Sequence, residues 1–284
     1  MDTSSRITGA TRLMGVIGSY LDHSSSPEIH NAVFEKLGWD YAYVPLDVSE
    51  ENLEAAVRGL EALGFLGYNV AAPHKKRIVP YLHEISRVAE IMGAVNTVVI
   101  QGGRSLGDNA DGAAFMRNLV LNGINVLGKK ITVLGAGGAA SAVIVQAALD
   151  GVAQIDVFNR DDSYVKGGRA LIERLKNYSS CEVTLYDLAD TDKLRASIAE
   201  STLLLNATIV GSPDEPGCLV DESMLVPWSH CFGYGLHSAG NGVDCYSAKA
   251  KGNKTLDGVG VFLQQAAIGE TSRGLAVRCL LIRA

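Results

Sequence analysis

The sequence lacks the features that mark several large classes of protein. It has five cysteines in 284 residues, an odd number, and none of them forms a CxxC pair. We therefore expect neither a disulfide framework nor a zinc site, and a reducing compartment fits best. The sequence contains no uninterrupted apolar run of about 18 residues, the length of a membrane span. Its start has no basic segment followed by an apolar core. We expect a cytoplasmic protein without a signal peptide or a membrane span.

Positive charge is also scarce. The chain has 25 Lys and Arg against 31 Asp and Glu, a formal net charge of −6, and no basic stretch stands out. Nucleic acids and anionic membranes attract clustered positive charge, so this balance argues against both as partners. Apolar residues make up 47% of the chain, and there are 31 glycines. This composition excludes a disordered chain and is sufficient for the cores of one or two domains.

Strand and helix patterns alternate along the first third of the chain. Apolar runs predict strands over residues 13–18, 41–46 and 67–70. Helical spacing predicts a helix over 27–37, closed by Gly38, and a second helix that begins after Ser49. Such alternation is typical of an α/β unit with a parallel sheet.

The middle of the chain contains a βαβ unit with a turn of small residues. Strands are predicted over 129–134 and 154–159, a helix over 141–149, and a later strand over 203–206. The turn at 135–140 would expose backbone N–H groups at a helix N-terminus, where the helix dipole attracts a pyrophosphate. Its spelling is GAGGAA rather than GxGxxG, so an ordinary tight turn is the alternative.

The predicted elements suggest two domains and a C-terminal segment. The first domain spans 1–108 and the second, the dinucleotide-binding unit, spans 109–257. The final segment, 258–284, contains an apolar helix that would return to pack on the first domain. That return would place a cleft between the two domains.

Polar residues follow the second strand of the βαβ unit, at Asn159, Arg160, Asp161 and Asp162. An acid in this place accepts hydrogen bonds from the adenosine ribose of NAD and repels the 2′-phosphate of NADP, whereas an arginine pairs with that phosphate. Two acids beside one arginine favour NAD. A solvated loop of mixed charge is the alternative.

Three polar clusters lie in the first domain, and each also has a purely structural explanation. The stretch 23–27, His-Ser-Ser-Ser-Pro, places hydroxyls at a helix start, where serines often serve as caps. The stretch 69–75, Asn-Val-Ala-Ala-Pro-His-Lys, puts a lysine beyond a strand end, and most lysines are simply solvated. The stretch 107–112, Gly-Asp-Asn-Ala-Asp-Gly, has the residues of a turn.

Taken in order, these motifs resemble the shikimate/quinate dehydrogenase family. The series is HSxSP, NVxxPxK, GAVNTV, GDNxDG, VLGAGGA, FNR, NATxVG and a late GxxxxxxQ, and it runs from residue 17 to residue 265. The loop 159–162 and the stretch 183–190 are most similar to the quinate/shikimate branch, which accepts NAD. The resemblance implies an α/β substrate domain followed by a Rossmann-like, doubly wound dinucleotide-binding domain. It also implies an NAD(P)-dependent oxidoreductase that interconverts cyclic hydroxy acids and their 3-dehydro ketones.

The resemblance also implies a role for each matching residue. Lys75 would transfer the proton with Asp111 as its partner, Ser24 and Ser26 would hold the substrate carboxylate, and Asn96 and Gln265 would bind ring hydroxyls. The cofactor would be bound by Gly135, Ala136, Gly137, Gly138, Ala139, Asn159, Arg160, Asp161, Asp162, Asn206 and Gly258. NAD is the preferred cofactor and NADP the alternative, no metal is implied, and the family contains both monomers and homodimers.

Four positions depart from the family pattern. Ala71 and Ala110 replace threonines, Tyr20 replaces a proline, and His237 falls where a tyrosine is expected. A lost hydrogen bond is worth about 0.5–1.5 kcal/mol, so several losses alter substrate choice. Two alternatives follow: a dehydrogenase for an amino or deoxy ring acid, and a catalytically weak paralogue that acts as a dinucleotide or ligand sensor. An unrelated two-domain Rossmann dehydrogenase is a third alternative, but it does not explain the ordered motifs of the first domain.

Overall fold

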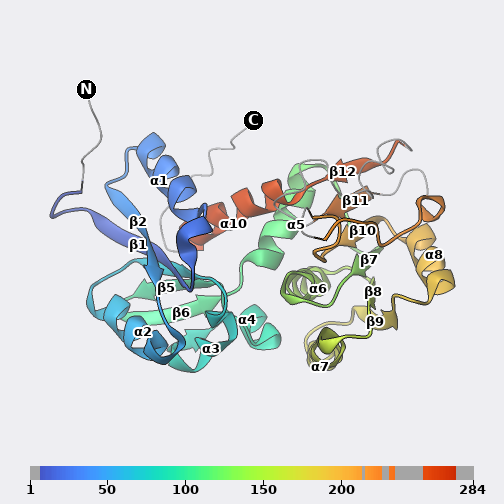
Figure 1. The fold of residues 1–284 in the computed structure, drawn as a ribbon, viewed down its shortest axis with the longest axis horizontal. Helices are drawn as coiled ribbons and strands as arrows, with labels where there is room; N and C mark the ends of the chain where they lie inside the picture. The colour runs from blue at the N-terminus through green and yellow to red at the C-terminus, as the bar shows by residue number, and fades with distance from the viewer. Residues whose placement is uncertain (1–6, 213–214, 226–229, 234–251, 273–284) are drawn as a thin grey trace. The chain divides into compact units, whose positions relative to one another are not determined.

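The computed structural model describes residues 7–212, 215–225, 230–233 and 252–272. The chain divides into two compact units, one formed by Met1–Ala110 with Ala266–Ala284 and the other by Asp111–Gln265. Each unit is built on one six-stranded sheet with helices packed beside it (Figure 1). The expected α/β class is confirmed. In the part of the chain that is described, no helix combines the length and the apolar character needed to cross a membrane.

The sheet of the first unit has the strand order β2-β1-β3-β5-β6-β4. Its strands are β1 (Arg12–Gly18), β2 (Tyr41–Asp47), β3 (Gly67–Val70), β4 (Glu84–Ile85), β5 (Thr97–Gln101) and β6 (Arg104–Asp108). The first three are parallel, as expected, but β5 runs antiparallel to both β3 and β6. The expectation of a parallel sheet therefore fails at β5. The turn at Gly102 and Gly103, with φ of 57° and 75°, joins β5 to β6 as an antiparallel hairpin.

Short helices surround this first sheet. They are α1 (Ser26–Leu37), α2 (Leu53–Ala62), α3 (His74–Arg77) and α4 (Arg87–Met92), with 3₁₀ turns η1 (Leu21–His23), η2 (Glu50–Asn52) and η3 (Val79–Tyr81). The helix expected after Ser49 begins as the turn η2, and the Ser49 side chain caps no backbone N–H. Its Oγ instead accepts a hydrogen bond from Asn52 Nδ2 at 3.0 Å. The apolar face of α2 packs on the sheet through Leu53, Val57 and Leu60.

The sheet of the second unit is parallel throughout, with the order β12-β11-β10-β7-β8-β9. Its strands are β7 (Lys130–Leu134), β8 (Gln154–Asn159), β9 (Glu182–Asp187), β10 (Leu203–Asn206), β11 (His230–Gly233) and β12 (Lys254–Leu256). The chain builds outward from β7 in one direction and then resumes at β10 on its other side. This is the doubly wound arrangement, in which ligands bind where the strand order reverses.

Helices join the strands of this second unit. They are α5 (Asp111–Leu121), α6 (Gly138–Asp150), α7 (Ser163–Leu175), α8 (Thr191–Glu200) and α10 (Gly258–Ser272), with a 3₁₀ turn η4 (Glu222–Met224). Helix α10 begins in the second unit, and its residues from Ala266 onward belong to the first.

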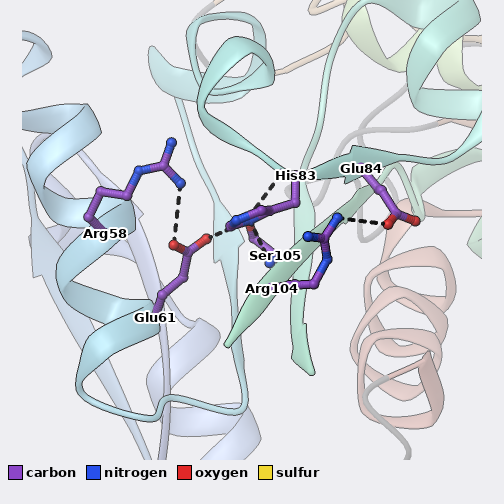
Figure 2. Close-up of polar contacts among 6 residues, drawn as sticks. All are labelled: Arg58, Glu61, His83, Glu84, Arg104 and Ser105. Carbon is purple, nitrogen blue, oxygen red and sulfur yellow. Dashed lines mark hydrogen bonds and ion pairs between the residues drawn. The ribbon is translucent and has the colours of Figure 1, made fainter. Parts of the chain in front are cut away.

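A polar cluster in the first unit links α2 to the strands β4 and β6 (Figure 2). The buried carboxylate of Glu61 accepts a hydrogen bond from Arg58 at 3.3 Å and lies 3.3 Å from His83 Nδ1. His83 in turn contacts Ser105 Oγ at 3.0 Å. Burial, followed by the charge of Glu61, raises the pKa of the nearby Tyr68 hydroxyl. The cluster contains none of the residues expected to bind substrate or cofactor, so we interpret it as structural.

A second polar network fastens α8 to the sheet of the second unit. The Asp156 carboxylate, 1% exposed, lies 2.9 Å from Lys130 Nζ and accepts hydrogen bonds from Ser197 Oγ at 2.8 Å and Gln154 Nε2 at 3.0 Å. Burial opposes ionisation of Asp156, but the hydrogen bonds outweigh it and lower the pKa of this carboxyl. Burial likewise acts against the charged form of Lys130, yet its two carboxylate partners, Asp156 and Glu200, raise its pKa.

We predict that Asp156→Ala lowers the free energy of unfolding by about 3 kcal/mol, because it removes the buried partner of an ammonium group. The matched control Glu200→Gln removes the exposed partner of the same Lys130, at 2.7 Å, and is expected to leave the free energy of unfolding nearly unchanged, because exposed ion pairs contribute little. Urea unfolding measures both variants.

The same pair has a defined dependence on pH. Since the pKa of Asp156 is lowered by folding, its stabilisation is present above the ordinary carboxyl pKa of about 3.9 and is lost as the pH falls below it. The difference in the free energy of unfolding between wild type and Asp156→Ala should therefore shrink as the pH is lowered from about 5 to about 3. A difference that stays constant over that range would contradict the assignment.

Candidate functional site

The glycine-rich turn joins β7 to α6 where the strand order of the second sheet reverses. At Gly135, φ is +105°, and a Cβ would lie 2.9 Å from Thr208 Cγ2, so a side chain does not fit there. At Gly137 and Gly138 a Cβ would meet nothing within 4 Å, which leaves open space at the start of α6. The first N–H groups of a helix have no partner within it and carry the positive end of its dipole. The turn therefore has both the room and the polarity to bind a pyrophosphate.

Asn159 ties the end of β8 to this turn. Its buried Oδ1 accepts a hydrogen bond from the Ala136 N–H at 2.9 Å, and its Nδ2 donates to the Arg160 carbonyl at 2.7 Å and to Asp162 Oδ1 at 2.9 Å. Asp162 also caps α7 by accepting from the Tyr164 N–H at 2.9 Å. Both side chains shape the loop that follows β8. Arg160 and the exposed Asp161 are the other two residues of that loop expected to meet the adenosine.

The loop after β10 forms the other side of the turn. Asn206 Oδ1 accepts hydrogen bonds from the N–H of Thr208 at 3.1 Å and from its Oγ1 at 2.7 Å, and Asn206 Nδ2 donates to the Val210 carbonyl at 3.1 Å. Asn206 thereby fixes the loop that approaches Gly135. The last residue expected to bind cofactor, Gly258, is buried at the start of α10.

Asp111 and Gln265 are in direct contact. Asp111 is the first residue of α5, and its Oδ1 accepts a hydrogen bond from Gln265 Nε2 of α10 at 2.6 Å. Two close approaches between helices permit this contact. A Cβ at Gly112 would lie 2.3 Å from the Ala142 carbonyl oxygen of α6, and a Cβ at Gly260 would lie 2.4 Å from Asn118 Oδ1 of α5. The structure thus brings together two residues expected in the site that are 154 positions apart.

The side-chain amide of Asn96 is held in one orientation just before β5. The residue is 1% exposed, and its Oδ1 accepts hydrogen bonds from Thr97 Oγ1 at 2.9 Å and from the Ala110 N–H at 2.9 Å. Its Nδ2 is buried and, among the residues described, has no hydrogen-bond partner. An unsatisfied buried donor costs about 1–3 kcal/mol, which a ligand hydroxyl would relieve. That donor is closed to solvent in this structure, so a ligand oxygen would reach it only after neighbouring groups move.

Asn69 is a site candidate that the sequence analysis missed. Its Oδ1 accepts a hydrogen bond from Tyr43 OH at 2.7 Å, and its Nδ2 donates to the Asn96 carbonyl and to Thr97 Oγ1, both at 3.3 Å. The Tyr43 ring stacks on His30 of α1, with 4.2 Å between ring centroids. These contacts connect α1 and β2 to the loop that carries Asn96. The sequence contained a pattern that could have identified Asn69, since this residue begins the motif that ends on Lys75.

Lys75 lies in the single-turn helix α3, and its side chain is half-buried. The helix is held on both sides. The Val95 N–H donates to the Lys75 carbonyl at 2.7 Å, the buried His74 Nε2 lies 2.7 Å from the Val48 carbonyl oxygen, and Arg77 pairs with Glu50. These contacts fix the backbone from which the Lys75 amine extends.

The two serines expected to bind a carboxylate lie at the start of α1. Ser26 is its first residue, and its N–H donates to Ser24 Oγ at 3.4 Å. Ser25 is the N-cap residue, but its side chain makes no capping hydrogen bond. The Ser24 hydroxyl, rather than that of Ser25, therefore accepts an N–H at the start of α1. Tyr20, the departure just upstream, is exposed and has a left-handed backbone with φ of 60°.

The other departures differ in what they change. Ala110 is buried and contributes its backbone N–H to Asn96, so its side chain is not part of a surface that a ligand contacts. Ala71 is half-buried and packs beside Leu21 in an apolar cluster, which offers a methyl group where the family pattern has a hydroxyl. His237 lies outside the described residues.

The comparisons with known proteins agree with this class of fold. A doubly wound sheet with an anion-binding turn, joined to a second α/β unit, is typical of dinucleotide-dependent dehydrogenases. Residues 16–98 match the family described as the shikimate dehydrogenase substrate binding domain. The shikimate dehydrogenase (NADP(+)) of Listeria monocytogenes serotype 4b is 39% identical, over 92% of this chain and 90% of the relative. That of Streptococcus uberis is 37% identical, over 93% and 91%.

Solved structures give the same result. Shikimate 5-dehydrogenase from Listeria monocytogenes, in complex with shikimate and NAD, has a TM-score of 0.91 at 39% identity and covers 94% of this chain and 92% of that one. Quinate dehydrogenase from Corynebacterium glutamicum, in complex with NAD, has a TM-score of 0.81 at 29% identity, with 91% and 92% covered. The chain belongs to the shikimate/quinate dehydrogenase family and is an oxidoreductase.

We predict that Gly112→Ala destabilises the second unit by about 1–3 kcal/mol and moves Asp111 away from Gln265. The reason is that the new Cβ collides with the Ala142 carbonyl, and overpacking against backbone has this order of cost. The matched control is Gly167→Ala in α7, where a Cβ meets nothing within 4 Å. That variant should be neutral or stabilised by up to about 1 kcal/mol, since alanine favours helix.

Urea unfolding of the two variants measures the effect, and a crystal structure of Gly112→Ala measures the separation of Asp111 from Gln265. Equal stability of the two variants, with the hydrogen bond retained, would refute the constraint at Gly112.

Proposed function

We propose that this protein interconverts a cyclic hydroxy acid of the shikimate or quinate type and its 3-dehydro ketone, with a nicotinamide dinucleotide as the redox partner. The observation that carries the proposal is the hydrogen bond of Gln265 Nε2 to Asp111 Oδ1 at 2.6 Å, which joins two residues of the expected site that are 154 positions apart. A polyhydroxylated ring has neighbouring hydroxyls that such a carboxylate and amide can bind. The relatives named shikimate dehydrogenase, at 36–39% identity over nearly the whole chain, support the same substrate class.

The residues divide the work of the reaction. Lys75 accepts the proton of the hydroxyl that becomes the ketone, and Asp111 is its partner in that transfer. Ser24 and Ser26 bind the ring carboxylate, and Asn96 and Gln265 bind ring hydroxyls. The bound cofactor supplies the acceptor for the hydride that leaves the same carbon.

The cofactor is NAD in preference to NADP in this proposal. The support is the loop after β8, where Asp161 and Asp162 follow one arginine. The Asp162 carboxylate also accepts hydrogen bonds from Asn159 Nδ2 and from the Tyr164 N–H. Carboxylates there accept hydrogen bonds from the ribose and repel a 2′-phosphate. Both cofactors occur among the relatives, since curated relatives are named NADP(+) enzymes and solved relatives contain NAD or NADP+.

A second candidate substrate is an amino or deoxy ring acid, and Ala71 is the observation that favours it. The methyl group of Ala71 lies in an apolar cluster with Leu21 and offers no hydrogen bond to a ring hydroxyl. A substrate without a ring hydroxyl at that position would have no polar group left without a hydrogen bond beside Ala71. Steady-state assays with shikimate, quinate and their amino and deoxy analogues separate the two candidates, because the preferred acid has the higher kcat/KM.

We predict that Lys75→Met lowers kcat about 10²–10⁴-fold, the usual contribution of a positioned acid–base group, and leaves the Kd of the dinucleotide unchanged. The matched control is Lys76→Met, which removes the neighbouring, exposed lysine of the same helix and should retain wild-type kcat. Reduction of the dinucleotide by the ring acid measures turnover, and fluorescence titration measures binding. Full turnover by Lys75→Met would eliminate the proposed proton transfer.

We also predict that Gly137→Asp separates stability from cofactor binding. Gly137 is the N-cap of α6 with an extended backbone, a position where aspartate caps a helix well, so the variant should be as stable as wild type or more so. Its carboxylate would occupy the open space of the turn and repel a pyrophosphate. The dinucleotide Kd should therefore rise at least about tenfold, an electrostatic effect of ordinary size. Unchanged Kd by calorimetry would show that the dinucleotide binds elsewhere.

A further inference from the structure

Glu215 lies beside the one arginine of the loop expected to hold the adenosine. Arg160 Nη1 is 3.4 Å from Glu215 Oε1, with side-chain exposures of 58% and 38%. The Glu215 backbone is held in a turn, since its carbonyl accepts from the Gly211 N–H at 2.8 Å and its N–H donates to Ser212 Oγ at 3.2 Å. These two hydrogen bonds hold the Glu215 backbone against Gly211 and Ser212.

The position of Arg160 gives this contact a functional meaning. In doubly wound sheets, an arginine just after the second strand accommodates the 2′-phosphate that distinguishes NADP from NAD. Arg160 directly follows β8, the second strand outward from the glycine-rich turn, and Asn159 ties this strand end to the turn through Ala136. A 2′-phosphate that bound this guanidinium would compete with Glu215 for it.

We infer that Glu215 is a specificity-determining residue that selects NAD over NADP by occupying Arg160. The inference rests on the proposed function, because it requires a dinucleotide to bind at the glycine-rich turn.

The local charge opposes a 2′-phosphate, whereas an exposed ion pair contributes little by itself. Asp161, Asp162 and Glu215 supply three carboxylates against one guanidinium, so the local charge before any ligand binds is already negative. A 2′-phosphate adds a charge of about −1.5 to −2 near neutral pH. A bound 2′-phosphate would take Arg160 away from Glu215 and would also repel the Glu215 carboxylate. The ribose hydroxyls of NAD carry no charge and have neither effect.

The test is the affinity of the intact protein for the two cofactors, with no turnover required. Titration with NADPH and NADH, followed by nicotinamide fluorescence, should show tighter binding of NADH to wild type. Glu215→Gln should tighten NADPH binding about tenfold and change NADH binding less than about twofold. The reason is that only NADPH has a 2′-phosphate that the Glu215 carboxylate repels. The matched control Glu173→Gln, which breaks an exposed pair with Lys176 in α7, should change neither affinity.

A second variant shows whether Arg160 mediates the effect. In an Arg160→Gln background, Glu215→Gln should tighten NADPH binding clearly less than about tenfold, because only the direct repulsion between Glu215 and the phosphate remains to be removed. An unchanged NADPH-to-NADH affinity ratio in Glu215→Gln, or a wild type that binds NADPH more tightly, would overturn the inference and leave the dehydrogenase assignment intact. Failure of wild type to bind either cofactor would instead overturn the proposed function.

Discussion

The close packing of α5 on α6 at Gly112 is the constraint on which the site of the second unit depends. Because position 112 carries no side chain, the backbone of α5 approaches the Ala142 carbonyl of α6. Helix α6 begins at the glycine-rich turn, and α5 begins at Asp111. One helix contact therefore sets the carboxylate relative to the anion-binding turn. The absence of a side chain at Gly260 likewise lets α10 pack closely on α5, which allows Gln265 to reach Asp111.

The first unit uses hydrogen bonds where the second uses close helix packing. Its candidate ligands lie on short segments at strand ends, and backbone groups hold them in place. Ala110 and Thr97 orient the Asn96 amide, and Val95 holds the backbone of Lys75. Such preorganisation leaves few polar groups to reorient when a substrate binds, which favours selective recognition of hydroxyl groups.

Local patterns in the sequence predicted much of this arrangement. The apolar runs of β1, β7 and β8 and the glycine stop of α1 depend on neighbouring residues, so periodicity and turn chemistry were sufficient to find them. The antiparallel β5 was not expected, because strand direction depends on which partner a strand meets. The contact of Glu215 with Arg160 spans 55 positions and has no local signature. Likewise, only the structure shows that the side chains of Asn159 and Asp162 form hydrogen bonds within the loop itself.

Direct transfer of hydrogen from the ring acid to the nicotinamide is the central claim of this account. The measurement that tests it most directly uses shikimate and quinate deuterated at the carbon that becomes the ketone, mixed with the protein and NAD+. The account predicts that NMR finds one deuterium on the reduced nicotinamide ring for each 3-dehydro ketone formed. Deuterium released into the solvent, or ring acids that leave the dinucleotide oxidised, would contradict it.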